Sequence, residues 1–378
     1  MKQLKELLFE LSAKLISVPP SDIGREIEAG LKLIGEFWDF DRITLTEFSD
    51  EGDEIRIVHS YTVPGVTKAP LNKIDDGIPW IIAKLRLGEK VVLSKLPHDL
   101  PDEAKTDRRY FIKEGLKSAL ALPVKIGSSI LGGFFLASFH QKRNWNNGLV
   151  RELYYLAEIL ASALERIRAA EQINELMRFE HLLSEISATY INLPHGQLDI
   201  VIRNDLGRLG RLLGADRCVL YSRTEDKKQF RWNYAHMWWP EEDDEIIKSL
   251  DAWKEHDWDF FEHFRYAFDK WSHNEVVLFS GLDEFPEEAS RLKEIYQRFG
   301  VKSSLSVPMS VAGSTVGALV IATTRKHRNW PEDLVQRLRL FGEVFANGLM
   351  RKRNEEEIQQ AISEIKNSKT NSRRITCI

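Results

Sequence analysis

The aromatic and basic side chains between residues 231 and 271 are the most chemically suggestive group in this sequence. Six of the ten tryptophans lie within these residues, together with several other rings. Ligand pockets are mostly apolar with a few placed polar groups, so the rings could line a cage for an apolar or planar molecule, with Arg231 or Arg265 pairing with an acidic group. The alternative is that they supply a local core. The candidate ligand-binding residues are Tyr221, Arg231, Trp232, Tyr234, Trp253, Trp258, Phe261, Arg265 and Trp271.

Two further sets of side chains could form sites. In the first half of the chain, the polar and aromatic candidates for contacting a ligand are His59, Tyr61, Trp80, Arg109 and Tyr110. In the second half, His236, His256 and His263 lie near several carboxylates, and two histidines with one carboxylate can hold iron or zinc. Spacing alone does not define such a site, and histidines on an acidic helical stretch are more typical of a solvated surface. We therefore predict no metal site.

Motifs for catalysis and for nucleotide binding are absent. The sequence contains no GxxxxGK[ST] loop, kinase signature, GxSxG motif, HExxH or paired CxxC. Its two cysteines, Cys218 and Cys377, exclude a disulfide framework and favour a reducing compartment. Because no nucleophile and base can be named that would act together, we predict neither an enzyme nor a resident cofactor.

Charge and hydropathy exclude two classes of partner. The 53 Lys and Arg residues against 57 Asp and Glu give a net charge of −4 that is spread along the chain, which argues against binding to nucleic acid. No segment approaches the roughly 18 consecutive apolar residues of a membrane span. The opening MKQLKELLFELSAKL interleaves charges with leucines, unlike a signal peptide. We expect a cytoplasmic location and no membrane partner.

The chain contains two copies of one domain-sized unit. Residues 115–168 align without gaps to residues 300–353, with 19 identities in 54 positions. A second ungapped match aligns residues 7–45 with residues 182–220 and includes the dipeptide Asp-Arg at 41 and 216. A period this long indicates whole domains in tandem, because solenoid repeats span roughly 20–50 residues. About ten extra residues fall in the aromatic middle of the second copy.

Each copy shows the same order of predicted elements. Helices at 2–17 and 22–38, matched by 175–192 and 198–213, precede a hairpin such as DRITLTEF with EIRIVHSYT. After a variable helical middle come two strands joined by a tight turn with glycine at 127 or 313. A tryptophan, Trp145 or Trp330, then precedes a long closing helix and is predicted to anchor its start on the core. The sheet should be mostly antiparallel and flanked by helices.

This order of elements resembles the GAF domain in both copies. The resemblance rests on Leu122-Pro123 or Val307-Pro308 in the strand-turn-strand unit, on Gly132 or Gly317 after the turn, and on the closing helix. The closing segment is similar to GAF modules of bacterial sensor histidine kinases and transcription activators. The resemblance implies an α+β fold with an antiparallel sheet of about six strands, helices on one face, and on the other a lid over a small-molecule pocket.

The residues that define several GAF subtypes are missing. The last strands read Leu136-Ala137-Ser138-Phe139 and Ile321-Ala322-Thr323-Thr324, without the Asn-Lys of cyclic-nucleotide-binding members. Neither cysteine has the histidine neighbour of bilin-binding members. One core cysteine cannot supply the several reactive thiolates of the methionine sulfoxide reductase type. The ligand is therefore unknown, and the second copy is the preferred place for it.

Heptad spacing predicts long helices that carry an output. Apolar residues recur from Leu149 to Ile186 with no Gly or Pro before Leu193, which predicts one helix of about 44 residues between the copies. We expect GAF-like domains at 1–170 and 175–355, a helical linker at 171–192, and a helical extension with a polar tail at 356–378. The predicted function is a signal-sensing module that binds a small molecule under a lid and transmits through a parallel helical homodimer to a separate or missing output domain, with a histidine kinase or another output protein as the candidate partner. The alternative is a ligand-free dimerisation or protein-interaction scaffold.

Overall fold

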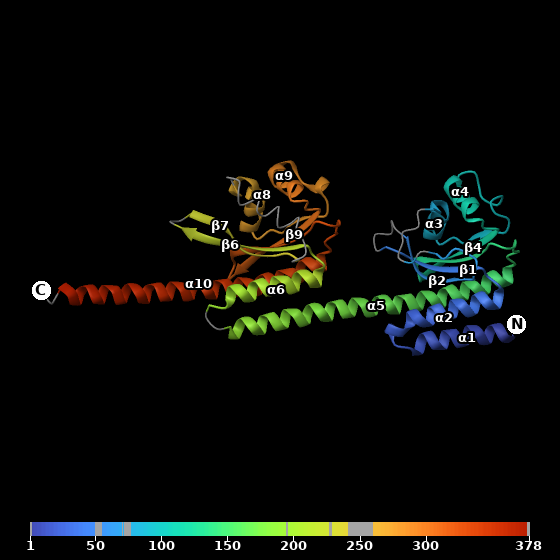
Figure 1. Ribbon diagram of the computed structural model, residues 1–378, viewed down its shortest axis with the longest axis horizontal. Coiled ribbons are helices and arrows are strands. Elements are labelled where there is room, and N and C mark those ends of the chain that lie inside the picture. The colour runs from blue at the N-terminus through green and yellow to red at the C-terminus, as the bar shows by residue number, and fades with distance from the viewer. Residues whose placement is uncertain are drawn as a thin grey trace. The chain divides into compact units, whose positions relative to one another are not determined.

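The computed structural model describes residues 2–49, 55–69, 71, 77–193, 196–226, 229–240 and 260–375. The chain divides into two compact units, Met1–Asn174 and Glu175–Ile378, which we call unit 1 and unit 2 (Figure 1). Among the described residues, no helix has both the length and the apolar composition that crossing a membrane requires.

Unit 1 is built on one antiparallel sheet with helices on both faces. Its elements in chain order are α1 (Lys2–Ser17), α2 (Pro20–Trp38), β1 (Arg42–Phe48), β2 (Ile55–Thr62), α3 (Pro79–Arg86), β3 (Val91–Leu93), α4 (Lys105–Glu114), β4 (Ser118–Ile126), β5 (Ser129–Ser138) and the first part of α5 (Asn147–Asn192). The strand order is β2-β1-β5-β4-β3. Helices α2 and α5 cover one face, which we call the helix face, and α3 and α4 cover the other, which we call the lid face (Figure 1).

Unit 2 repeats this arrangement. Its elements are the end of α5, then α6 (Leu198–Leu213), β6 (Arg217–Asp226), β7 (Gln229–Trp238), α8 (Phe260–Ser272), β8 (Val277–Phe279), the short 3-10 helices η1 (Leu282–Glu284) and η2 (Glu287–Ala289), α9 (Ser290–Arg298), β9 (Ser303–Val311), β10 (Ser314–Thr323) and α10 (Glu332–Ile375). The strand order β7-β6-β10-β9-β8 is that of unit 1. Helices α6 and α10 lie on the helix face, and α8 and α9 on the lid face.

The strands bury alternate side chains on the two faces, as the pleat of a strand requires. In β1, Ile43 and Leu45 belong to the helix-face core, while Thr44 and Thr46 point to the lid face. The predicted α+β class with mainly antiparallel sheets is confirmed. The prediction of about six strands is wrong by one, since each sheet has five strands among the described residues. In each unit, the described residues between the first two strands and the last two strands form helices and a single short strand.

The long helices follow the predicted pattern. Helix α5 is continuous over 46 residues, so the predicted long helix is confirmed. Toward its two ends its apolar residues are buried within each unit, Leu153 and Leu160 in unit 1 and Leu182 and Ile186 in unit 2, whereas Ile173 and Leu176 are exposed. Helix α10 continues to Ile375, further than the expected polar tail allows, because no Gly or Pro interrupts it after residue 348.

The tripeptide Arg-Asn-Trp, which occurs at 143–145 and again at 328–330, joins the last strand to the closing helix in each unit. In unit 1, Arg143 donates to the Asp39 carbonyl and the Trp145 indole N–H donates to the Leu93 carbonyl over 3.2 Å. In unit 2, the Trp330 indole N–H donates to the Phe279 carbonyl over 3.3 Å. The tryptophans therefore anchor the helix starts on the core, as the sequence predicts.

Candidate ligand-binding site

A cavity of about 330 Å³ lies on the lid face of unit 1. The sheet forms its floor, α3 and α4 form two walls, and the described residues 67–69 border it. Its apolar lining includes Ile55, Ile57, Val91, Phe111 and Ala121. A volume near 300 Å³ is at the lower end of the range for small-molecule sites, which are typically apolar with few polar groups.

A buried carboxylate holds the two lid helices together. Helix α3 begins with Pro79 and has no capping side chain of its own. Asp107 of α4, fully buried, accepts hydrogen bonds from the backbone N–H groups of Trp80 at 3.2 Å and Ile81 at 3.1 Å. The carboxylate thus satisfies the free N–H groups at the helix start and faces the positive end of the helix dipole. Because acceptor and donors are far apart in sequence, capping patterns could not predict this contact.

Arg42 is the buried cation of the cavity. Its Nη1 donates to the Thr67 carbonyl over 3.3 Å and lies 3.8 Å from a carboxylate oxygen of Glu114. The guanidinium also lies 4.8 Å from the centre of the Phe139 ring. Its exposed fraction is 8%, so the charge has been removed from water with only modest compensation. The sequence analysis did not select Arg42, although the repeated Asp-Arg dipeptide at 41 and 216 pointed to this place.

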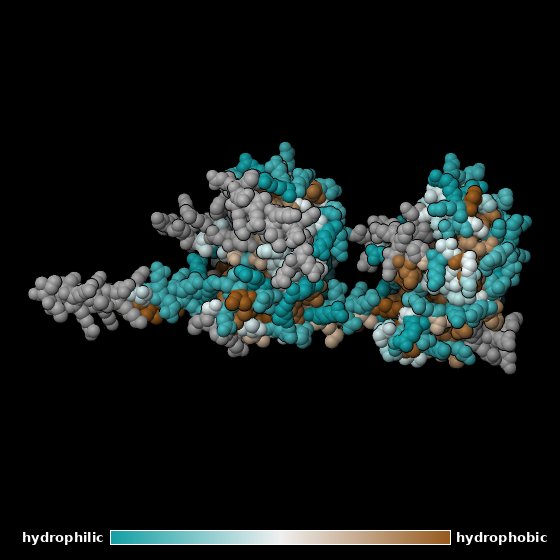
Figure 2. Space-filling view, viewed as in Figure 1, coloured by the Kyte–Doolittle hydropathy of each residue, from teal (hydrophilic) through white to brown (hydrophobic). Residues whose placement is uncertain are grey.

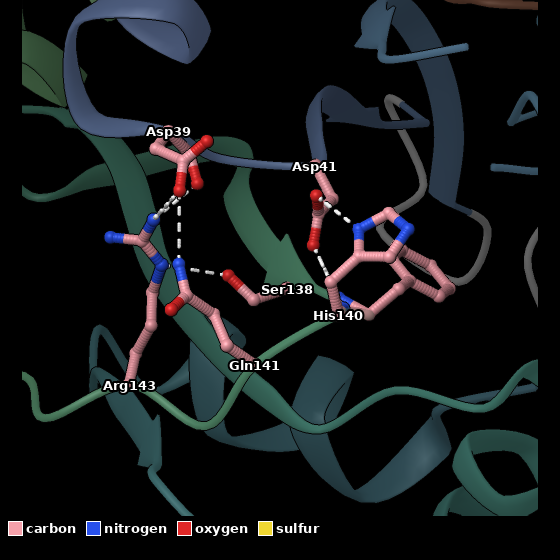
Figure 3. A network of polar contacts seen from close by, with 7 residues as sticks. Asp39, Asp41, Ser138, His140, Gln141 and Arg143 are labelled. Carbon is pink, nitrogen blue, oxygen red and sulfur yellow. Dashed lines mark hydrogen bonds and ion pairs between the residues drawn. The ribbon is translucent and has the colours of Figure 1, made fainter. Parts of the chain in front are cut away.

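The residue before Arg42 fixes the start of β1. Figure 3 shows Asp41 facing His140, beside a second group formed by Asp39, Gln141 and Arg143. Asp41 accepts the backbone N–H groups of Phe139 at 2.6 Å and His140 at 3.1 Å, and lies 2.7 Å from the His140 Nδ1 atom. Burial alone would raise the pKa of the Asp41 carboxyl, but these hydrogen bonds outweigh it and hold the pKa below its ordinary value.

The structure brings only one of the five unit 1 candidates to the cavity. Tyr110 lines it and lies against Gly77, where a Cβ would come within 2.4 Å of the ring. Trp80 contacts Lys84, and Arg109 is exposed and hydrogen-bonds Thr106. Neither borders the cavity among the described lining residues.

His59 and Tyr61 lie on the opposite face of the sheet from the cavity, which corrects their expected position under the lid. His59 contacts Gly24 and Tyr61 contacts Gly35, both on α2. The cause is a β-bulge in the pairing of β1 with β2, where Leu45 pairs with His59 and Thr46 with Ile57. One extra residue in a strand moves every following side chain to the other face, so simple alternation assigns these two side chains to the wrong side.

In unit 2 the described aromatic candidates pack against one another. Trp232 stacks on Phe268 with ring centres 5.2 Å apart, and Tyr221 lies 5.5 Å from Trp271. The Trp271 indole N–H donates to the Ser306 hydroxyl over 2.9 Å. Beside Arg217, the described residues leave a cavity of about 60 Å³ that Tyr221 and Phe264 border. They form a core of the kind that the alternative interpretation anticipates.

Among the described residues, the candidates Trp232 and Arg265 border one wide hollow of about 1020 Å³ on the lid face of unit 2, whose other lining includes Glu262, Asp269 and Arg291. The Arg265 side chain is 79% exposed and pairs with Glu262. Trp253 and Trp258 lie outside the described residues, as do the side chains of Arg231, Tyr234 and Phe261.

Of the predicted histidines, His256 is outside the described residues and His236 lies on the helix face, 3.3 Å from Asp199. No group of three or more metal-ligating side chains occurs in the part of the chain that the structure describes.

The lid faces of the two units can be aligned residue by residue. The Lys84–Glu89 ion pair corresponds to Lys270–Glu275, and the β1–β2 register corresponds to the β6–β7 register. In this alignment, five positions that carry aliphatic or small residues in unit 1 carry aromatic residues in unit 2. The pairs are Thr46 and Tyr221, Ile55 and Trp232, Ile78 and Phe264, Ile82 and Phe268, and Leu85 and Trp271.

Comparisons with known proteins agree with this fold. The family model described as the GAF domain matches residues 198–349, which lie in unit 2. Among solved structures, a bacteriophytochrome from the photosynthetic bacterium R. palustris is similar, with a TM-score of 0.56 and 11% sequence identity over 93% of this chain and 76% of that chain. At this identity the likeness concerns the fold alone. No curated protein matches the sequence.

Proposed function

We propose that this chain is a tandem GAF-like sensory module in which the lid-face cavity of unit 1 receives a small molecule. One observation carries the proposal: against the sheet and beside the buried arginine that begins its first strand, unit 1 leaves about 330 Å³, whereas the described residues of unit 2 leave about 60 Å³ at the equivalent place. The GAF match in unit 2 supports a sensory or signalling module in general. The shared strand order supports extending the GAF-like assignment to unit 1.

In this proposal the aromatic lid face of unit 2 has a structural role and does not bind the ligand. The rings of Tyr221, Phe264 and Phe299 border the space of about 60 Å³ that the described residues leave beside Arg217, where a ligand equivalent to that of unit 1 would lie. A ligand-free scaffold remains the second candidate function for the whole chain, and this filled face is the observation that favours it. The remaining unit 2 candidates, including Arg231 and Trp258, stay a hypothesis for a ligand site.

The signal would leave through the helices of a parallel homodimer. A ligand shifts an equilibrium between two arrangements only by its difference in affinity for them. Candidate contacts between protomers are the exposed Ile358, Ile362 and Ile365, whose spacing follows a heptad on α10. Figure 2 shows a largely hydrophilic surface on this side of unit 2, with apolar side chains grouped over α6. A histidine kinase or another output protein would read the change.

Adjacent valines on β3 test the ligand site. Val91 lines the cavity and Val92 is exposed on the other side of the strand. Mass spectrometry of small molecules released from natively purified protein should find a ligand in wild type and in Val92→Phe but not in Val91→Phe. Circular dichroism checks that both variants fold. A released ligand that survives Val91→Phe, or no ligand in any preparation and no hit in a thermal-shift screen of metabolites, would favour the scaffold.

The dimer has its own test on α10. Ile362→Asp should shift sedimentation toward monomer by placing charges in the protomer contact, while the exposed neighbour Gln360→Asp should leave the dimer intact. Wild-type protein that sediments as a monomer at every concentration would contradict transmission through a dimer.

A further inference from the structure

The donors of Arg42 are only partly used. A guanidinium has five N–H donors in a fixed planar fork. Both polar contacts that the described residues make with this group, to Thr67 and to Glu114, involve Nη1. The guanidinium carbon also lies over the Phe139 ring, 4.8 Å from the ring centre. The Nε and Nη2 edge, which can bind a carboxylate through two parallel hydrogen bonds, is not engaged by these residues.

Charge at the cavity favours an anion. Among the described lining residues, Arg42, Lys68 and Lys113 are cationic and Glu114 is the only carboxylate. The two lysines are exposed, whereas Arg42 is buried. A buried cation with a distant counterion is stabilised by any anion that reaches it, because the interaction is stronger away from water. Lysines beside an entrance raise the local concentration of anions.

Much of the rest of the cavity is apolar, and its volume limits the size of the ligand. Besides the charged residues, the lining combines apolar side chains such as Ile57, Phe111 and Ala121 with the hydroxyl-bearing Thr44 and Thr46 on the floor. At the ~30 Å³ that one water molecule occupies in the liquid, 330 Å³ corresponds to about ten non-hydrogen atoms. The space suits a molecule with one charged end and a compact hydrocarbon body, and it is too small for a nucleotide.

Unit 2 provides an internal comparison for the arginine. Arg217 occupies the position of Arg42, and Phe299 occupies that of Glu114, so that the guanidinium of Arg217 lies 5.8 Å from a ring centre. The described cavity beside Arg217 measures about 60 Å³, which leaves no room for a ten-atom molecule. The buried arginine is common to both units, but only in unit 1 does it border a cavity of ligand size.

From this combination, we infer that the unit 1 cavity binds a small monocarboxylate, with the carboxylate on the Nε and Nη2 edge of Arg42 and the hydrocarbon body against Ile57 and Phe111. This inference rests on the proposed function, because it assigns a ligand class to the same cavity. Binding of the carboxylate would bring a second anion near Glu114. The Arg42–Glu114 pair at 3.8 Å would weaken, and with it one link between β1 and the lid helix α4.

Calorimetric titration with benzoate and octanoate, each paired with its neutral amide, tests the ligand class. Wild-type protein should bind at least one of the two acids at least about 10-fold more tightly than the matching amide, because two charge-assisted hydrogen bonds distinguish them. Arg42→Gln should abolish this preference. The matched control Arg217→Gln, which changes the equivalent residue of unit 2, should keep it. Val91→Phe should abolish binding of both compounds.

Glu114→Gln keeps the test decisive if Arg42→Gln does not fold. Removing the competing carboxylate should tighten binding of the acid several-fold and leave the amide unchanged. Amides that bind as tightly as their acids, or acids that bind neither variant nor wild type, would overturn the monocarboxylate assignment. The proposed small-molecule site would survive that result if Val91→Phe still removes a released ligand, so the two failures are distinguishable.

Discussion

The lid faces of units 1 and 2 are packed with different side chains, whereas their helix faces are packed in the same way. Both helix faces are closed by a long helix and by a buried tryptophan that donates to a carbonyl of the short strand. On the lid faces, Ile55, Ile78 and Leu85 of unit 1 stand where Trp232, Phe264 and Trp271 fill unit 2. Interiors pack to constant density, so enlarging the side chains at a few positions is enough to remove a cavity. The two units thus share a strand order, while the space that the described residues leave beside the buried arginine differs between about 330 Å³ and about 60 Å³.

The largest expected effect concerns the filled lid face. Trp271→Ala in unit 2 should lower the free energy of unfolding by about 3–5 kcal/mol, because it removes a fully packed ring and its hydrogen bond to Ser306. The matched change Leu85→Ala in unit 1 should cost less, toward about 2–3 kcal/mol, because leucine is smaller than tryptophan and its side chain makes no hydrogen bond. Urea unfolding monitored by circular dichroism measures both. An equal or larger cost for Leu85→Ala would break the contrast between the two faces.

The second prediction converts unit 1 into a likeness of unit 2. Ile55→Trp combined with Ile78→Phe should abolish ligand binding in unit 1 by filling the cavity. The stability cost should stay within about 1–3 kcal/mol, the usual range for added volume in a core. Calorimetry with benzoate or octanoate and thermal unfolding provide the two readings. Retained binding would show that the ligand does not occupy the space that these side chains border.

The third prediction concerns what the two units share. Trp145→Phe and Trp330→Phe each remove an indole N–H donor to a carbonyl of the short strand. Each should lower the free energy of unfolding by about 1 kcal/mol, the usual value of one hydrogen bond. Denaturant titrations of both single variants check the symmetry. A large difference between them would mean that the repeated tripeptide serves different roles in the two units.

The smallest effect is pH-dependent and arises on the helix faces. Burial lowers the pKa of His59 and of His236 more than the nearby Glu28 and Asp199 raise it. The unfolded chain then binds protons more readily than the folded chain, so stability should fall as pH drops below about 6.5. Replacing His236, which also faces Lys352 and Arg203, by Gln should reduce this slope. Unfolding at about pH 7.5 and about pH 5.5 measures it, and an unchanged slope in His236→Gln and His59→Gln would exclude both histidines.

Local patterns in the sequence were sufficient to predict the internal repeat, the order of elements, the glycine turns at 127 and 313, and the long helix. Turn residues, proline positions and heptad spacing act within a few residues of one another, and the glycines at 127 and 313 do adopt the positive φ that their turns need. The tryptophan that precedes each closing helix likewise predicted that Trp145 and Trp330 anchor the helix starts.

Only the tertiary structure decided where the cavity lies and which residues border it. The cavity is the space that side chains from five strands and two helices leave unfilled when they pack. These side chains are far apart in the sequence, so no short stretch of it contains the information that sets the volume. A one-residue bulge turned His59 and Tyr61 away from the cavity, and Asp107 caps a helix that begins 28 residues earlier. Arg42 became a candidate because the fold placed a partly engaged cation beside an apolar space, a relation that sequence spacing does not encode.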